Sequence, residues 1–162
     1  MDFVIEMASG EIDLKVMIEL RKKSQKPYAI EEIAYILQFL SKQYDYLEKK
    51  RIAHSDVKPN NVIIALNEQS QDDFLYCIAD FGTSFLLEEN EKMISCNNLS
   101  GFTPKYAAPE ITLIESGNNT FSTYDPFLSD VYSLGVLVLD LLGINKKSFL
   151  KKNSEVIIIS FI

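Results

Sequence analysis

The chain is poor in the residues that mark several common classes of protein. It contains two cysteines, one histidine and no tryptophan among 162 residues. Cys77 and Cys96 are the whole cysteine content, so neither a disulfide framework nor a zinc site is indicated, and a reduced intracellular location, taken as the cytoplasm, is expected. With 16 basic and 23 acidic residues the net charge is −7, which argues against general binding to nucleic acid.

Long apolar segments and a targeting signal are also missing. The longest apolar run, LGVLVLDLLGI, is interrupted by Asp140 and is shorter than the ~20 residues that a membrane-spanning helix needs. The first ten residues contain no basic stretch followed by an apolar one, so no secretory signal is predicted. Six glycines and five prolines are too few for a low-complexity chain, and the composition is that of one folded domain.

What the sequence does contain is the pattern of an α+β fold that is mostly α. Residues 9–23 predict a short helix with Ile12, Val16 and Leu20 on its apolar face. Residues 130–142 are apolar nearly all round and predict a helix buried in the centre of a domain. The longest predicted helix follows Pro27, because apolar residues recur there every three or four positions. These residues are Ile30, Ile33, Leu37, Leu40, Tyr44 and Leu47.

Short strands and one long loop complete the predicted elements. FVIEMA, at residues 3–8, has the composition of a buried strand, and its position leads us to expect a further part of the domain before it. VIIAL and FLYCIA, at residues 62–66 and 74–79, predict two strands joined by a polar turn. Residues 82–105 are rich in Ser, Asn and Thr, which predicts a long functional loop.

The main chemical signal is the polar stretch HSDVKPNN at residues 54–61. Asp56 could align an attacking hydroxyl, Lys58 could reach a phosphate oxygen, and Asn61 offers an amide oxygen to magnesium. These residue types suit phosphoryl transfer, in which a protein contributes mainly positioning and charge. Taken alone, the stretch could equally be a polar turn whose Asp and Asn side chains cap backbone groups.

Three further motifs favour the phosphoryl-transfer interpretation. They are ADFG at residues 79–82, AAPE at residues 107–110 and SDVYSLG at residues 129–135. Together with HSDVKPNN they occur in the order seen in the eukaryotic protein kinase family, which the sequence therefore resembles. The resemblance implies a protein kinase-like fold with only its large C-terminal lobe present, as helices and short β-hairpins around the catalytic loop. It covers residues 1–143, and residues 144–162 are expected to be a divergent or truncated tail.

The resemblance implies an ATP-dependent serine/threonine protein kinase that acts on a protein substrate. Lys58 is typical of the serine/threonine branch. By resemblance, Asp56 is the catalytic base, Lys58 contacts phosphate, and Thr103 hydrogen-bonds to both. ATP and Mg²⁺ are the implied cofactors, with Asn61 and Asp80 as the magnesium ligands.

Further contacts follow from the same resemblance. The backbone of Glu6 and Ala8 would bind adenine, and Ile63 would lie beneath its ring. Asp130 would anchor the backbone of the catalytic loop, although on its own it could simply be a carboxylate near the start of a helix. His54 is expected to be a packed scaffold residue without a catalytic role.

Several parts of the family pattern have no counterpart in the sequence. The six glycines never form G-x-G-x-x-G, and no V-A-I-K strand precedes the expected hinge. Glu110 lacks an arginine partner, since the only arginines lie upstream of it. Ser55 replaces the arginine that pairs with a phosphorylated residue in the family, so that switch is not expected. A surface near Ile5 and Ile63 would then be left exposed and could receive a protein partner.

Two alternatives to an active kinase stay open. The chain could be a catalytically inactive pseudokinase or protein-interaction module, because the small lobe is missing. It could also be a small-molecule phosphotransferase of kinase-like fold, but such enzymes generally lack the segment between Asp-Phe-Gly and Ala-Pro-Glu that is present here. We therefore rank that possibility last.

Overall fold

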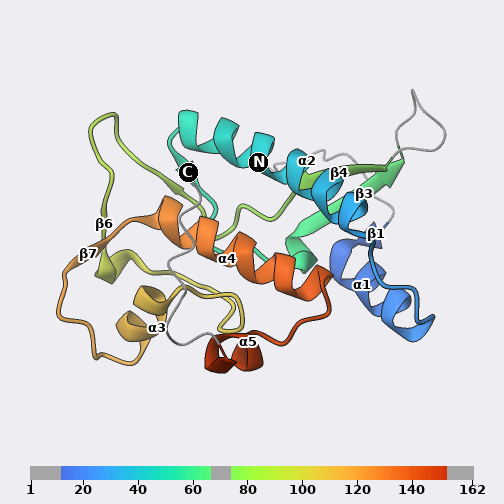
Figure 1. Cartoon of the computed structure of the whole chain (residues 1–162). Helices are drawn as coiled ribbons and strands as arrows, with labels where there is room; N and C mark the ends of the chain where they lie inside the picture. The colour runs from blue at the N-terminus through green and yellow to red at the C-terminus, as the bar shows by residue number, and fades with distance from the viewer. Residues whose placement is uncertain (1–11, 67–73, 153–162) are drawn as a thin grey trace, which may run out of the picture.

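The computed structural model describes residues 12–66 and 74–152 of the chain (Figure 1). The helices are α1 (Leu14–Lys23), α2 (Ile30–Lys49), α3 (Pro109–Glu115), α4 (Pro126–Leu141) and α5 (Lys146–Lys152), with single 3₁₀ turns η1 (Pro59–Asn61) and η2 (Cys96–Asn98). The strands are β1 (Ile12–Asp13), β2 (Ile52–Ala53), β3 (Val62–Leu66), β4 (Phe74–Ile78), β5 (Phe85–Leu86), β6 (Ile94–Ser95) and β7 (Thr123–Tyr124). The expected mixed α and β fold, mostly helical, is confirmed.

Helix α1 begins later than the sequence predicts and buries a different face. Asp13 caps its first turn, accepting a hydrogen bond from the backbone N–H of Val16 at 2.7 Å. The buried side is formed by Leu14, Met17 and Ile18. The predicted face is wrong, because Val16 is exposed and Ile12 lies before the helix, in strand β1.

Helix α2 is confirmed as the longest helix. Ile33, Ile36 and Leu40 are buried on one side of it, whereas the predicted member Ile30 is 66% exposed at the first turn. A two-contact ion pair between Arg21 and Glu32 joins α1 to α2, with Nη–Oε distances of 2.5 and 3.0 Å.

The two strands expected after the catalytic loop are confirmed as an antiparallel pair. Val62 pairs with Ile78, and Leu66 at the other end pairs with Phe74. Strand β1 adds to the free edge of β3, which gives the strand order β1-β3-β4. Tyr76 contributes from β4 to the core that this sheet shares with α1, α2 and α4. The turn at 67–73 and the strand expected at 3–8 lie outside the described residues.

Helix α4 runs beside α2 through the middle of the molecule and links two hydrophobic clusters (Figure 1). Leu137 and Leu141 near its end join the cluster around α2. Phe127 near its start packs against a second cluster, which includes residues of α3, β6 and β7. The predicted burial holds for residues 132–141, which are all buried or half-buried, but not for the start of the predicted segment, where Val131 is 45% exposed.

The long loop at residues 82–105 is largely irregular, as expected, but two short strands and η2 hold it in place. Strand β5 pairs with β2 directly before the catalytic loop, and β6 pairs with β7 directly before α4. The loop is therefore attached at both places to segments that carry candidate site residues. Among the helices of residues 12–66 and 74–152, none combines the length and hydropathy of a membrane span.

Candidate active site

The catalytic-loop stretch lies where the end of α2 meets the antiparallel strands. Arg51 takes a positive φ of 63°, which turns the chain from α2 into β2. The loop then passes through η1 into β3, and the pairing of Val62 with Ile78 brings the segment after β4 alongside it. The backbone N–H of Ala79 donates to the carbonyl oxygen of Asn61 at 2.9 Å. The pairing of β3 with β4 therefore brings Asn61, directly before β3, close to Asp80, which follows β4.

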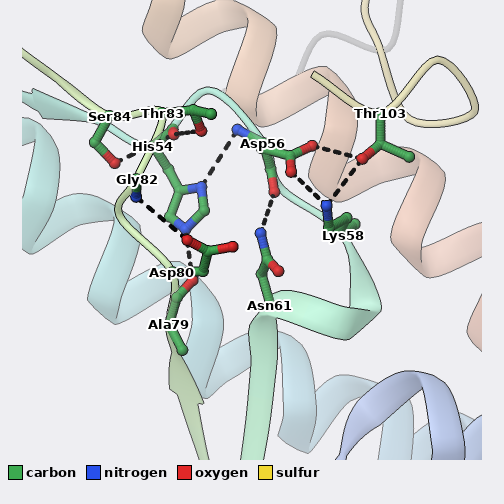
Figure 2. Close-up of polar contacts among 10 residues, drawn as sticks. All are labelled: His54, Asp56, Lys58, Asn61, Ala79, Asp80, Gly82, Thr83, Ser84 and Thr103. Carbon is green, nitrogen blue, oxygen red and sulfur yellow. Dashed lines mark hydrogen bonds and ion pairs between the residues drawn. The ribbon is translucent and has the colours of Figure 1, made fainter. Parts of the chain in front are cut away.

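Asp56, Lys58 and Thr103 form a closed set of polar contacts (Figure 2). Lys58 Nζ donates to Asp56 Oδ2 at 2.5 Å and to Thr103 Oγ1 at 3.0 Å. Thr103 Oγ1 donates to Asp56 Oδ1 at 2.8 Å. The side chains of Asp56 and Lys58 are 11% and 21% exposed, so both are held in place yet reach solvent. The structure thus brings together all three residues that the resemblance implies for catalysis.

His54 is completely buried and connects the surrounding segments. Its Nε2 lies 2.9 Å from the carbonyl oxygen of Ala79, and the backbone N–H of Asp56 donates to its Nδ1 at 3.3 Å. These contacts require the tautomer that carries its proton on Nε2. Burial is the main cause that lowers the pKa of His54 below its ordinary value, so the ring is neutral at pH 7. This environment is that of a scaffold residue.

Asp130 of α4 binds the backbone of the catalytic loop. Its Oδ2 accepts the backbone N–H of His54 at 2.6 Å, and its Oδ1 accepts that of Ser55 at 2.8 Å. Ser55 takes a positive φ of 69°, an unfavourable conformation for serine that these contacts support. Burial raises the pKa of Asp130 to about 7, while the two backbone donors oppose the shift. The anchoring contact expected of Asp130 is confirmed.

Asp80 stands at the start of the long loop with its side chain exposed to solvent. It has a positive φ of 62°, and its Oδ1 accepts the backbone N–H of Gly82 at 3.3 Å. A Cβ at position 82 would lie 3.2 Å from that same oxygen, so glycine leaves the carboxylate room. The ring of the next residue, Phe81, packs against His54, with the two ring centroids 5.1 Å apart.

Asn61 and Asp80 have the chemistry of magnesium ligands. Asn61 Nδ2 donates to the carbonyl oxygen of Asp56 at 2.9 Å, which fixes the amide and leaves Oδ1 as an acceptor. In the part of the chain that the structure describes, no three His, Cys, Asp or Glu side chains form a metal cage. Two oxygen ligands without a cage fit Mg²⁺, because it usually keeps several waters and takes its other ligands from phosphates.

The remaining residues singled out from the sequence are those expected near adenine and the unpaired glutamate of the Ala-Pro-Glu motif. Ile63 is half-buried on the opposite side of β3 from the buried residues Val62 and Ile64. Glu6 and Ala8 lie outside the described residues. Glu110 forms no ion pair within residues 12–66 and 74–152, and instead its Oε1 accepts a hydrogen bond from Ser129 Oγ at 2.7 Å.

Sequence reasoning missed the hydroxyls that tie the long loop to the catalytic loop. Thr83 Oγ1 and Ser84 Oγ lie 3.3 and 3.2 Å from the carbonyl oxygen of His54, to which both can donate. Their position directly after Asp-Phe-Gly was visible, but only the pairing of β2 with β5 shows that they reach His54. Ser129, the partner of Glu110, had no sequence signal beyond its place in SDVYSLG.

Comparison with known proteins places these residues in one family. The protein kinase domain family matches residues 1–160. The chain is 37% identical over 99 residues to a probable receptor-like protein kinase of Arabidopsis thaliana, which covers 61% of this chain and 11% of that protein. It is 30% identical over 156 residues to the probable serine/threonine-protein kinase nek1 of Dictyostelium discoideum, covering 89% of this chain and 30% of the relative.

A third relative is the serine/threonine-protein kinase par-4 of Caenorhabditis elegans, 31% identical over 99 residues, or 61% of this chain and 14% of the relative. The chain thus spans less than a third of the length of each of these three proteins. Since the family match extends over nearly the whole sequence, the chain belongs to the protein kinase family, whose members are phosphotransferases.

Proposed function

We propose that the chain carries the catalytic large lobe of an ATP-dependent protein serine/threonine kinase. The observation that supports this most directly is the closed contact set of Asp56, Lys58 and Thr103, built beside Asn61 and Asp80. The sequence contains no glycine-rich loop and no V-A-I-K lysine. The proposal therefore requires a small lobe supplied from outside these 162 residues.

In the proposed reaction, Asp56 binds and orients the hydroxyl of a serine or threonine of the protein substrate. Each carboxylate oxygen of Asp56 already accepts one hydrogen bond, and each retains a lone pair for that hydroxyl. The hydroxyl oxygen attacks the γ-phosphorus of ATP, the bond to the ADP oxygen breaks, and the hydroxyl proton passes to Asp56. Thr103 and Lys58 keep the carboxylate pointed at the substrate throughout.

Lys58 contributes charge as well as position. Its ammonium lies beside Asp56, where it can contact an oxygen of the transferring phosphoryl group and balance the negative charge there. Asn61 and Asp80 would hold Mg²⁺, which when bound neutralises the phosphates of the nucleotide. Ile63, half-buried on the side of β3 away from the core, would support the adenine ring.

The second candidate is a catalytically inactive interaction module. The observation that favours it is the lack of any glycine-rich motif or clamping lysine in the sequence. The intact polar set argues against it, because a module that only binds a partner has no need of a solvent-accessible Asp56 held by two side chains.

The test is phosphoryl transfer by the chain joined behind the small lobe of a related serine/threonine kinase, with Mg-ATP and a generic protein substrate. We expect transfer by this joined protein and a loss of about a hundredfold or more when Asp56→Asn removes the base. Asp45→Asn is the matched control, because Asp45 is an exposed residue of α2 that forms an ion pair with Lys49, and it should leave the rate unchanged. A folded joined protein that binds ATP but transfers nothing would favour the interaction module.

A further inference from the structure

A small cavity lies between the catalytic loop and the start of α4. It measures about 20 Å³ and is lined by residues that include Ser55, Tyr124 and Asp130. This volume is that of a single water molecule, since a cavity needs roughly 10–15 Å³ of such space to hold one. The cavity is separate from the solvent-facing side of Asp56 and Lys58, neither of which lines it.

Two of the lining side chains carry buried hydroxyl groups without a partner. Ser55 Oγ and Tyr124 Oη are both shielded from solvent, and neither makes a hydrogen bond to any of the residues that the structure describes. Tyr124 is only 4% exposed. A buried hydroxyl without a partner loses the hydrogen bonds it makes to water in the unfolded chain, so two of them beside one cavity point to a shared polar ligand.

The third polar group of the cavity is the carboxylate of Asp130. Each of its oxygens accepts one backbone N–H from the catalytic loop and retains capacity for a second donor. Its negative charge acts on Tyr124, whose pKa is raised to about 12, first by burial and then by Asp130. Ser129 and Ser133 also line the cavity, but their hydroxyls already donate to Glu110 and to the carbonyl oxygen of Tyr106. The remaining lining side chains, such as Leu99, Phe102 and Ile111, are apolar and offer no hydrogen bond.

We propose that this cavity binds one internal water molecule, held by Ser55, Tyr124 and Asp130. Such a water would accept hydrogen bonds from the Ser55 and Tyr124 hydroxyls and donate one to the Asp130 carboxylate. These three contacts match the number that buried waters usually make. A metal ion is not needed to satisfy the groups, because two hydroxyl donors and one carboxyl acceptor suit neutral water.

The proposed water would add a hydrogen-bonded link between parts of the chain that lie far apart in the sequence. Tyr124 lies in β7, which pairs with β6 of the long loop, and Ser55 lies next to the catalytic Asp56. Through the water, the β6–β7 pair would support the strained backbone of Ser55, whose φ is 69°. Ser55 stands where the family pattern has arginine, and its small side chain leaves the space in which the water would sit.

The first test is direct detection of the water in the full 162-residue chain. In water-selective nuclear Overhauser NMR, we expect a long-lived water signal at the backbone amide protons of His54 and Ser55. Both amides donate hydrogen bonds to the Asp130 carboxylate. In the double variant Ser55→Ala/Tyr124→Phe this signal should disappear while the remaining amide spectrum stays folded. No water signal at these amides in the unmodified chain would overturn the proposal.

The second test is a double-mutant cycle on the unfolding equilibrium constant. Ser55→Ala and Tyr124→Phe should be non-additive by about fivefold, because each removes a partner of the same water. Tyr28→Phe is the matched control: Tyr28 also has a buried hydroxyl without a partner among the described residues, but it lines other cavities. Its effect should add to that of Ser55→Ala. Additivity of Ser55→Ala and Tyr124→Phe, or a direct hydrogen bond between the two hydroxyls, would contradict the proposal.

Discussion

At the scale of single residues, the site is organised around a buried, neutral histidine. The ring of His54 forms hydrogen bonds with the backbone of Ala79 and Asp56. Its backbone N–H donates to Asp130, and its carbonyl oxygen accepts from the hydroxyls that follow Asp80. The catalytic loop, helix α4 and the segment that follows β4 therefore all contact this one buried residue. Its neutrality at pH 7 matters, since a buried imidazolium would not fit these contacts.

The protonation of His54 gives the first prediction at this scale. The folded pKa lies below the unfolded value of about 6.5, because burial disfavours the charged ring. The folded chain then binds fewer protons than the unfolded chain near pH 6. The contribution of His54 to stability is complete above pH ~6.5 and is lost as the pH falls through the folded pKa. NMR titration in metal-free buffer tests this directly, as the chain has only one histidine. A ring pKa at or above the unfolded value would contradict it.

Thr103 gives the second prediction, made for the joined kinase. Thr103→Ala should lower kcat about tenfold, the effect of losing one net hydrogen bond of about 1.4 kcal/mol, with little change in KM for ATP. The reason is that Thr103 holds Asp56 and Lys58, which we propose to act on the substrate hydroxyl and the transferring phosphoryl group rather than on adenine. Thr103→Ser keeps the hydroxyl and should retain most of the activity. Equal losses in both variants would show that the methyl group, rather than the hydrogen bonds, is what matters.

At the scale of elements, periodicity predicted α2 well and α1 poorly. In α1 two apolar spacings compete, and the sequence alone gives no reason to prefer Leu14, Met17 and Ile18. The choice is made by tertiary structure, because Asp13 caps the helix and Ile12 pairs with Ile64 in the sheet. For the same reason the exposure of Val131 in α4 was not predictable, since it depends on where two separate clusters lie.

Sequence motifs predicted some features of the polar site, whereas others depend on how distant segments pack together. The chemistry of Asp56, Lys58, Asn61 and Asp80 could be inferred from residue types in order along the chain. The cavity beside Ser55 and the hydroxyl contacts to His54 could not, because they depend on distances between segments far apart in sequence.

A matched pair of isoleucines in α2 tests the packing account. Ile36 is fully buried and Ile30 is 66% exposed in the same helix. Ile36→Ala should lower the free energy of unfolding by about 2–5 kcal/mol, because it leaves a cavity in the cluster around α2. Ile30→Ala should change it by about 0.5 kcal/mol or less. Chemical denaturation of both variants is the measurement, and similar losses would show that the buried face is misassigned.

At the scale of the whole molecule, the site lies between two clusters that α4 holds together. The first cluster supports β3 and β4, next to which Asn61 and Asp80 lie, and the second supports the segment that carries Thr103. Asp130 sits in α4 between them and contacts the catalytic loop directly. The residues that we propose for the large-lobe part of catalysis are thus held by the fold, whereas nothing in the sequence supplies the glycine-rich loop and lysine that cover the nucleotide in the family pattern.

The most direct test of this account is phosphoryl transfer from Mg-ATP to a generic protein substrate, measured for residues 1–162 alone and for the same chain joined to a kinase small lobe. We predict that the chain alone shows no transfer above that of its Asp56→Asn variant, and that the joined protein transfers phosphate in an Asp56-dependent manner. Asp56-dependent transfer by the chain alone would contradict the account, as would a folded, ATP-binding joined protein that transfers none.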